Sequence, residues 1–306
     1  MSIIHGPVFP IPIPFNQKEE VDFMALRDYC DHLIKEGARH LLVTVGTSRF
    51  NLLTRDEMLR VNEVVARSTQ ETNAMAIAAG PGPSAGSLKE NIDFAQKAEE
   101  FGAKGIIVMY PERWYADDDV VRFFHGVAEH SNIGVWAHAV PMRDGLGGVN
   151  ASKIFCPSIV QRIIQHPNLV GVKEENGNRS IYEEILHKSK DQVSVIGAGG
   201  AMRRFMKDRP LGATNYLVGV ESLKPSLGIQ FFKAMMEDRL EDAEKLALNL
   251  EDPFFTKAIE FGWHPSLKTG LSIMKLMQNF ERSPFPVLQQ NQVNDLTKII
   301  QEYGWL

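Results

Sequence analysis

Short apolar runs alternate regularly with amphipathic segments over residues 1–222, and this alternation constrains the fold more than any other feature. Such runs, closed by polar turns, are typical of buried parallel strands, and helices between them are typical of α/β folds. The predicted strands are the first half of Ile3–Phe15, then His40–Val45, Ala74–Ala79, Gly105–Met109, Gly134–His138, Leu169–Lys173, Val193–Gly197 and Asn215–Gly219. Eight strands in this pattern predict a (β/α)8 barrel that ends near residue 222.

Helix boundary signals fall between these strands. Asp22 is placed to cap a first helix, and Thr54–Glu57 and Ser87–Glu90 both have the spacing of a capping box. Gly37 and Gly102 are placed to end helices before the next strand. The later helices are predicted at Asp117–His130, Ile154–Gln165 for the most part, Ile181–Lys188 and Met202–Asp208.

Residues 223–306 contain no strand pattern. Their periodicity predicts helices at Leu227–Glu237, Leu240–Glu260, Leu267–Phe280 and Val293–Tyr303. We therefore expect two parts, a barrel over residues 1–222 and a helical extension over residues 223–306 that packs on it.

Composition excludes several classes of protein. The chain has 306 residues, 44% of them hydrophobic, and a net charge of -5, which is typical of a globular protein and gives no indication of a nucleic-acid partner. The two cysteines, Cys30 and Cys156, form no disulfide framework, so we expect a reducing cytoplasm. No membrane span or secretion signal is predicted. His125 and His130 do not share one helical face, and we predict no metal site.

Polar motifs follow the predicted strands at their carboxyl ends. They are Gly46-Thr47-Ser48, Glu112-Arg113, His138, Lys173 and Gly197-Ala198-Gly199-Gly200. The carboxyl ends of barrel strands meet at one face, where active sites lie, so these motifs predict one site.

Lys173 is the candidate nucleophile of that site. Desolvation in the barrel mouth, together with nearby Arg113 and Arg143, would lower its pKa and favour the free amine. Backbone N–H groups of Thr47 and Ser48 are placed to hold a carboxylate. The alternative for Lys173 is a solvated lysine that opens a loop.

Several motifs in register resemble one family. Residues 46–57 (Gly-Thr-Ser-x-x-x-Leu-Leu-Thr-x-x-Glu) resemble the Gly-Thr-Thr-Gly-Glu…Leu-Thr-x-x-Glu signature of the dihydrodipicolinate synthase/N-acetylneuraminate lyase family. Gly171-Val172-Lys173-Glu174 resembles its Gly-Ile-Lys-Glu/Asp segment. Val140–Arg143 resembles Val-Pro-Gly-Arg, and His264–Lys268 resembles Asn-Pro-x-x-x-Lys. The resemblance covers essentially the whole chain.

This resemblance implies a class I, Schiff-base lyase. By the match, Lys173 forms a Schiff base with a 2-oxo acid, usually pyruvate, and Thr47 and Ser48 hold its carboxylate, with Thr47 also among the catalytic residues. Gly197 would lie beside the substrate, and Arg143 would meet the second substrate. The resemblance implies no cofactor, and a homotetramer.

The departures from the family pattern are also informative. His138 stands where the family has a catalytic tyrosine, and Glu112-Arg113 replaces a Tyr-Tyr pair. We therefore predict that the chain is not a true dihydrodipicolinate synthase and that His138 moves protons instead. The alternative is a histidine satisfied by local hydrogen bonds. We expect Arg49, Arg113 and Arg143 at the same barrel mouth, where together they predict an acidic substrate such as a sugar acid, unless they are solvated loop residues.

Two other functions fit the same barrel. The glycine-rich stretch after the seventh strand, residues 197–200, is the kind of loop that cradles a phosphate. The missing tyrosines also fit a barrel that binds a ligand without catalysis. We expect aldol cleavage, condensation or dehydration, and the residues alone leave these three reactions open.

Overall fold

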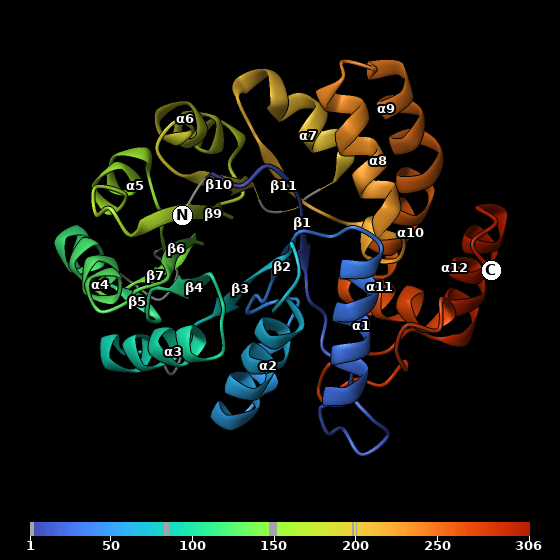
Figure 1. Ribbon diagram of the computed structural model, residues 1–306, viewed down its shortest axis with the longest axis horizontal. Coiled ribbons are helices and arrows are strands. Elements are labelled where there is room, and N and C mark those ends of the chain that lie inside the picture. The colour runs from blue at the N-terminus through green and yellow to red at the C-terminus, as the bar shows by residue number, and fades with distance from the viewer. Residues whose placement is uncertain (1–2, 83–85, 147–151, 198, 200) are drawn as a thin grey trace.

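A parallel eight-stranded sheet forms the centre of the molecule (Figure 1). The computed structural model describes residues 3–82, 86–146, 152–197, 199 and 201–306. In chain order the strands are β1 (Gly6–Pro10), β2 (His40–Leu42), β3 (Met75–Ala79), β4 (Gly105–Met109), β6 (Gly134–Ala139), β9 (Leu169–Glu174), β10 (Ser194–Gly197) and β11 (Asn215–Leu217). Their order in the sheet is β10-β9-β6-β4-β3-β2-β1-β11, and the end strands β10 and β11 are in contact. The sheet is nearly closed, which confirms the predicted barrel.

Helices surround the sheet on its outer side (Figure 1). They are α1 (Phe23–Lys35), α2 (Arg55–Ser68), α3 (Leu88–Glu100), α4 (Asp117–Glu129), α5 (Pro157–Ile163), α6 (Arg179–Ser189) and α7 (Met202–Asp208), with short 3₁₀ turns at Phe50–Leu52, Arg209–Leu211 and Val220–Ser222. Asp22 caps α1, and the capping box of Thr54 and Glu57 is complete. Ser87 caps α3, but the carboxylate of Glu90 binds Arg55 instead of completing the second box.

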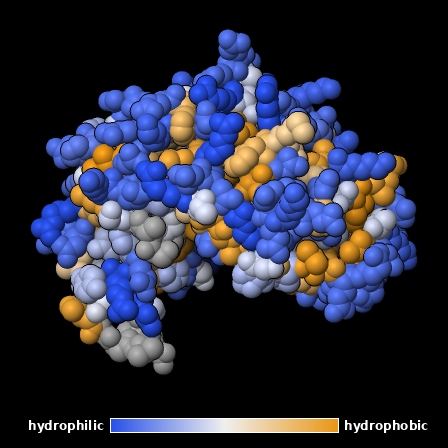
Figure 2. All heavy atoms as spheres, turned by 90° about the horizontal axis from the view of Figure 1, so that it is seen from below, coloured by the Kyte–Doolittle hydropathy of each residue, from blue (hydrophilic) through white to orange (hydrophobic). Residues whose placement is uncertain are grey.

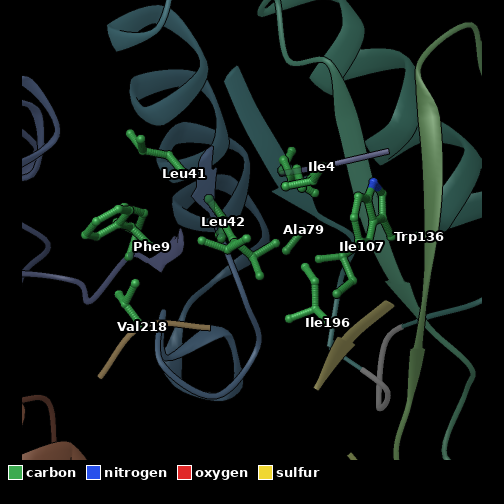
Figure 3. Packing of buried hydrophobic residues seen from close by; sticks show 14 of the residues in the cluster. Ile4, Phe9, Leu41, Leu42, Ala79, Ile107, Trp136, Ile196 and Val218 are labelled. Atoms are coloured by element: carbon green, nitrogen blue, oxygen red, sulfur yellow. The ribbon is translucent and has the colours of Figure 1, made fainter. Parts of the chain in front are cut away.

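The N-terminal segment links the two end strands of the sheet. The Ile4 backbone N–H donates to Ser194 Oγ of β10 at 2.7 Å, and the Ile4 carbonyl accepts from Thr214 Oγ1, just before β11, at 2.7 Å. Figure 3 shows Ile4 among core side chains from several strands, including Phe9, Leu42 and Ile196. These contacts bring β10 and β11 together where the strand pairing ends.

The packing of one large core side chain requires a glycine on the neighbouring strand. Trp136 of β6 is fully buried, and its indole lies across Gly171 of the neighbouring strand β9. A Cβ atom at Gly171 would lie 2.1 Å from Trp136 Cε3, so no larger residue fits there. The strand that carries Lys173 therefore packs closely against β6.

The chain after residue 222 is largely helical, as predicted, although the helix expected over Leu267–Phe280 ends at Ile273. It contains α8 (Pro225–Met236), α9 (Leu240–Leu246), a π-helical segment (Ala247–Glu251), α10 (Asp252–Phe261), α11 (Trp263–Ile273) and α12 (Gln290–Glu302). α8 packs on β1, and α12 packs on α10 and α11. The division at residue 222 stays a prediction.

The helix expected over Leu240–Glu260 is present, but it contains a π-helical turn that was not predicted. The π-helical turn interrupts it and directs the buried Glu251 inward, where its Oε1 accepts from the Met202 backbone N–H of α7 at 3.0 Å. Periodicity does not reveal this turn because a π-bulge changes the hydrogen bonds and leaves the apolar spacing almost unchanged.

Three short strands form a second sheet that the sequence did not predict. They are β5 (Arg113–Trp114), β7 (Met142–Asp144) and β8 (Ser152–Lys153), in the order β5-β7-β8. Strands of two or three residues are too short to show alternation, so only tertiary pairing reveals them.

The surface is largely hydrophilic. Figure 2 shows one face, on which apolar residues form scattered groups. Exposed large apolar side chains include Met24 and Leu146, and single residues of this kind are normal on a protein surface. Of the helices in the described ranges, none is long and apolar enough to cross a membrane.

Candidate active site

A cavity of about 260 Å³ opens at the carboxyl ends of the barrel strands. Its wall combines loops of the barrel with the C-terminal helices α10 and α11. The lining residues are Pro10, Thr44, Gly46, Thr47, His138, Lys173, Glu175, Gly199, Leu217, Val218, Gly219, Phe255, Ile259, Trp263 and His264. The predicted site residues Thr47, His138 and Lys173 therefore share one cavity.

Lys173 lies near the end of β9, between β6 and β10. Its Cα is in register with His138 of β6 and with Ile196 of β10. The residue is 3% exposed. Burial lowers the pKa of Lys173 because it disfavours the ammonium form, although the charge of Glu175 acts in the opposite direction. A buried lysine of lowered pKa that faces a cavity has the properties of a nucleophilic amine.

Two polar side chains, those of His138 and Glu175, meet at the Lys173 amine. Lys173 Nζ lies 2.9 Å from His138 Nε2 and also contacts Glu175 Oε2. His138 Nε2 lies 2.7 Å from the same Glu175 oxygen. The backbone N–H of Glu175 donates to the Ala139 carbonyl at 2.7 Å, which holds the carboxylate beside β6.

The two partners of Lys173 have shifted pKa values. Burial, together with the charge of Lys173, lowers the pKa of His138 to about 4, so the ring is neutral near pH 7. Partial burial favours the neutral acid of Glu175, but the hydrogen bond from His138 and the charge of Lys173 outweigh it and lower the pKa to about 2. Glu175 is therefore a carboxylate.

The Gly46-Thr47-Ser48 loop is held by its own hydrogen bonds. Ser48 is fully buried; its Oγ donates to the Ile11 carbonyl at 2.6 Å, and its backbone N–H donates to the Thr44 carbonyl at 3.0 Å. Thr47 lines the cavity with Gly46. In this arrangement Ser48 fixes the loop, and Thr47 is the member of the pair that faces the cavity.

Arg49 ties this loop to the C-terminal segment. Its backbone is left-handed, with φ of 56°, and its Nη1 donates to the Gly46 carbonyl at 3.0 Å. The buried guanidinium pairs with Glu281 at 3.2 Å and stacks over the Phe285 ring. The contacts of Arg49 are therefore structural, and it is not among the described residues that line the cavity.

Arg113 and Arg143 lie together on the small second sheet. Their Cα atoms are partners in the β5–β7 pair. Both side chains are partly exposed, and Glu112 Oε1 lies 3.9 Å from Arg113 Nε and 3.7 Å from Arg143 Nη1. Neither arginine is among the described residues that line the cavity.

Gly197 ends β10 in register with Glu174 of β9. A Cβ atom at Gly197 would lie 2.7 Å from Arg204 Nη2 and 2.9 Å from the Tyr182 ring, so these side chains require glycine there. Of the predicted phosphate loop, Gly199 lines the cavity, whereas Ala198 and Gly200 lie outside the described residues. Within the described ranges, no group of three or more His, Cys, Asp or Glu side chains is arranged to hold a metal ion.

Sequence reasoning missed Glu175 and the helical wall. Glu175 follows Lys173 by two positions, and side chains two apart on extended backbone point to the same side, so this signal was present. His264 was noted only as part of a motif. It lines the cavity, and burial, together with the charge of Arg49, lowers its pKa to about 4. Nothing local in α10 or α11 indicated that these helices reach the barrel mouth.

The family of the chain follows from a match over almost its whole length. The model of the dihydrodipicolinate synthetase family matches residues 4–303. The chain belongs to this family. It is accordingly a lyase of the dihydrodipicolinate synthetase family, as the motifs predicted.

Individual relatives support the same conclusion. The 4-hydroxy-tetrahydrodipicolinate synthase of Pelobacter propionicus is 26% identical over 302 residues, which cover 98% of each chain. An uncharacterised DapA-like lyase of Pyrococcus abyssi is 22% identical and aligns with 80% of this chain and 79% of its own. A crystal structure of YagE from Escherichia coli K12, a prophage protein of the same family in complex with pyruvate, has a TM-score of 0.84 at 18% identity, with 100% of both chains covered. The similarity to YagE, at 18% identity, is evidence for the fold alone.

Proposed function

We propose that this dihydrodipicolinate synthetase family member forms a Schiff base between Lys173 and a 2-oxo acid, with pyruvate as the first candidate. The observation that supports this most is the buried Lys173 amine, of lowered pKa, that faces a cavity beside His138 and Glu175. The pyruvate complex of the family member YagE adds support for the substrate class. The iminium then serves as the electron sink for carbon–carbon or carbon–oxygen bond cleavage.

In this proposal the loop after β2 receives the carboxylate of the 2-oxo acid. Thr47 offers its hydroxyl from the cavity wall, and Ser48 keeps the loop in shape through its bonds to Ile11 and Thr44. Gly197 is proposed to lie beside the substrate. Because it has no side chain, it leaves room for Arg204 and Tyr182. No cofactor is required, because the iminium itself withdraws electrons.

His138 takes the place of the absent tyrosine as the group that moves protons. Its ring lies 2.9 Å from the Lys173 amine, within reach of the protons that move in the reaction. Since Arg113 and His138 replace the two relay tyrosines of the family pattern, we expect no useful rate of dihydrodipicolinate synthesis from pyruvate and aspartate semialdehyde. Robust turnover in a coupled synthase assay would refute this part of the proposal.

The second substrate is proposed to be an acidic sugar derivative. Arg113 and Arg143 lie side by side on the small sheet and form a cationic pair, with Glu112 as their neighbour. Arg143→Ala should raise KM for the acidic substrate by about tenfold, equivalent to about 1.4 kcal/mol, and leave pyruvate capture intact. Loss of pyruvate capture with unchanged substrate preference would instead place Arg143 in the pyruvate subsite or the fold.

The direct test is intact mass after borohydride reduction with a panel of 2-oxo acids. A stable adduct on Lys173, located by peptide mapping, is the expected result. A phosphate-binding barrel enzyme or a non-catalytic ligand-binding barrel would give no adduct with any 2-oxo acid. Cleavage, condensation and dehydration are then distinguished by product analysis with sugar acids.

We further propose a homotetramer in the cytoplasm. The family resemblance suggests the tetramer, and the free thiols of Cys30 and Cys156 fit a reducing compartment. Light scattering after size-exclusion chromatography tests the assembly, and a monomer at working concentration would contradict it.

A further inference from the structure

We propose that Glu175 is a catalytic acid–base of this site, which carries the protons exchanged between the nitrogen of Lys173 and the carbonyl oxygen of the substrate. The inference rests on the Schiff-base function proposed above and adds a residue to it. Glu175 qualifies as catalytic because its Oε2 contacts the reacting atom, Lys173 Nζ.

The hydrogen bonds at this point determine where the protons are. His138 Nε2 lies 2.7 Å from Glu175 Oε2, and a carboxylate only accepts, so Nε2 carries the hydrogen. The other ring nitrogen, Nδ1, is buried without a hydrogen-bond partner among the described residues. An unpaired acceptor is tolerated there better than an unpaired donor, which supports the same tautomer.

Attack on a carbonyl carbon requires the amine in its neutral form. Lys173 Nζ lies 2.9 Å from His138 Nε2, so a neutral amine can share the Nε2 hydrogen with Glu175 through its lone pair. One amine N–H is directed to Glu175, whose Oε2 accepts from both nitrogens. The Glu175 carboxylate is therefore the proton acceptor nearest the amine.

Glu175 also connects the amine to solvent. Its side chain is 45% exposed, whereas that of Lys173 is 4% exposed. Besides the Lys173 cavity, Glu175 lines a neighbouring cavity of about 710 Å³, and the two cavities also share Gly199 and Phe255. It is therefore placed to take up a proton from water and deliver it inside.

The proposed steps balance as follows. Nζ attacks C2 of the 2-oxo acid, an N–C bond forms, and the carbonyl electron pair moves to oxygen. Glu175 takes one proton from the resulting ammonium nitrogen and gives it to the alkoxide, which yields a neutral carbinolamine. Glu175 then takes one proton from solution and gives it to the hydroxyl group, which leaves as water while the nitrogen lone pair forms the C=N bond. The iminium charge finally faces the Glu175 carboxylate.

The test compares borohydride trapping rates with pyruvate across pH. Glu175→Gln keeps the shape of the side chain and an acceptor for His138 but carries no proton between atoms. The initial trapping rate of this variant should be lower than that of the wild type by about 100-fold or more. The dependence of the trapping rate on pH should also differ from that of the wild type. The matched control is Glu174→Gln, at the adjacent buried carboxylate that accepts from the Asn176 backbone N–H at 2.9 Å, and it should trap at close to the wild-type rate.

A second variant separates proton transfer from structure. Glu175→Ala should be slow, and added formate should restore part of its rate, because a small carboxylate fits the space left by the side chain. Formate should not accelerate the wild type or Glu174→Gln.

The possible failures are distinct. A Glu175→Gln rate within about threefold of wild type with an unchanged pH profile overturns the role of Glu175. Absence of rescue in a folded Glu175→Ala protein overturns it as well. If the wild type itself forms no adduct with any 2-oxo acid, the Schiff-base function fails first, and this role fails with it.

Discussion

Lys173 and Lys268 are both buried lysines near the carboxyl ends of the barrel strands, yet they differ in almost every other respect. Lys173 is 3% exposed and Lys268 is 1% exposed. Burial lowers the pKa of both amines, that of Lys268 to about 8. By burial and pKa alone, either residue would be a candidate nucleophile.

Their surroundings separate them. Lys268 Nζ donates to the Ile13 carbonyl at 2.5 Å, lies 3.9 Å from Glu281, and stacks over the Phe15 ring. It is not among the described residues that line the cavity. Lys173 instead faces the cavity and contacts two groups that can exchange protons, His138 and Glu175. A reactive lysine thus needs access and a proton acceptor in addition to burial.

The largest expected effect is the loss of chemistry at Lys173. Lys173→Met keeps the apolar stem and removes the amine, so borohydride trapping with pyruvate and any turnover should disappear entirely. Intact mass spectrometry measures the adduct. An adduct that persists at full yield in this variant would place the nucleophile elsewhere, and Lys268 would then be the next residue to test.

This comparison also shows what the sequence could and could not predict. Lys173 was found because it ends a short apolar strand, and both His138 and Thr47 were found because they follow strands of the same barrel. The contrast between Lys173 and Lys268 was not predictable, since it depends on which of them faces the cavity. That in turn depends on how α10 and α11 pack on the barrel, which no local pattern records.

The arginines show the same limit. Sequence position put Arg49, Arg113 and Arg143 near one barrel mouth. Arg49 instead joins the loop after β2 to Glu281, a partner 232 positions later in the chain. Such long-range ion pairs leave no periodicity, so tertiary structure alone assigns them.

A smaller effect is expected at Lys268, on stability instead of chemistry. Lys268→Met leaves the Ile13 carbonyl without its donor, whereas Glu281 keeps its contact with Arg49. An unsatisfied buried acceptor costs about 1–3 kcal/mol, so the free energy of unfolding should fall by that amount. Urea unfolding at fixed protein concentration measures it. Pyruvate trapping should be unchanged, and a lost adduct would show that Lys268 also serves the site.

The last expected effect is a change in the pH dependence of stability. The folded state lowers the pKa of Lys268 from 10.5 to about 8, so between these pH values the unfolded chain binds more protons at this residue than the folded chain does. The contribution of Lys268 to stability therefore rises with pH over this window, by about 1.4 kcal/mol per pH unit at most, and is lost as pH falls through 8. In Lys268→Met this contribution is absent, so the stability difference between wild type and variant should widen from pH 8 to pH 10. If this difference in unfolding free energy stays constant from pH 8 to pH 10, Lys268 remains charged in the folded state. Its contact with Glu281 then compensates for the loss of hydration on burial.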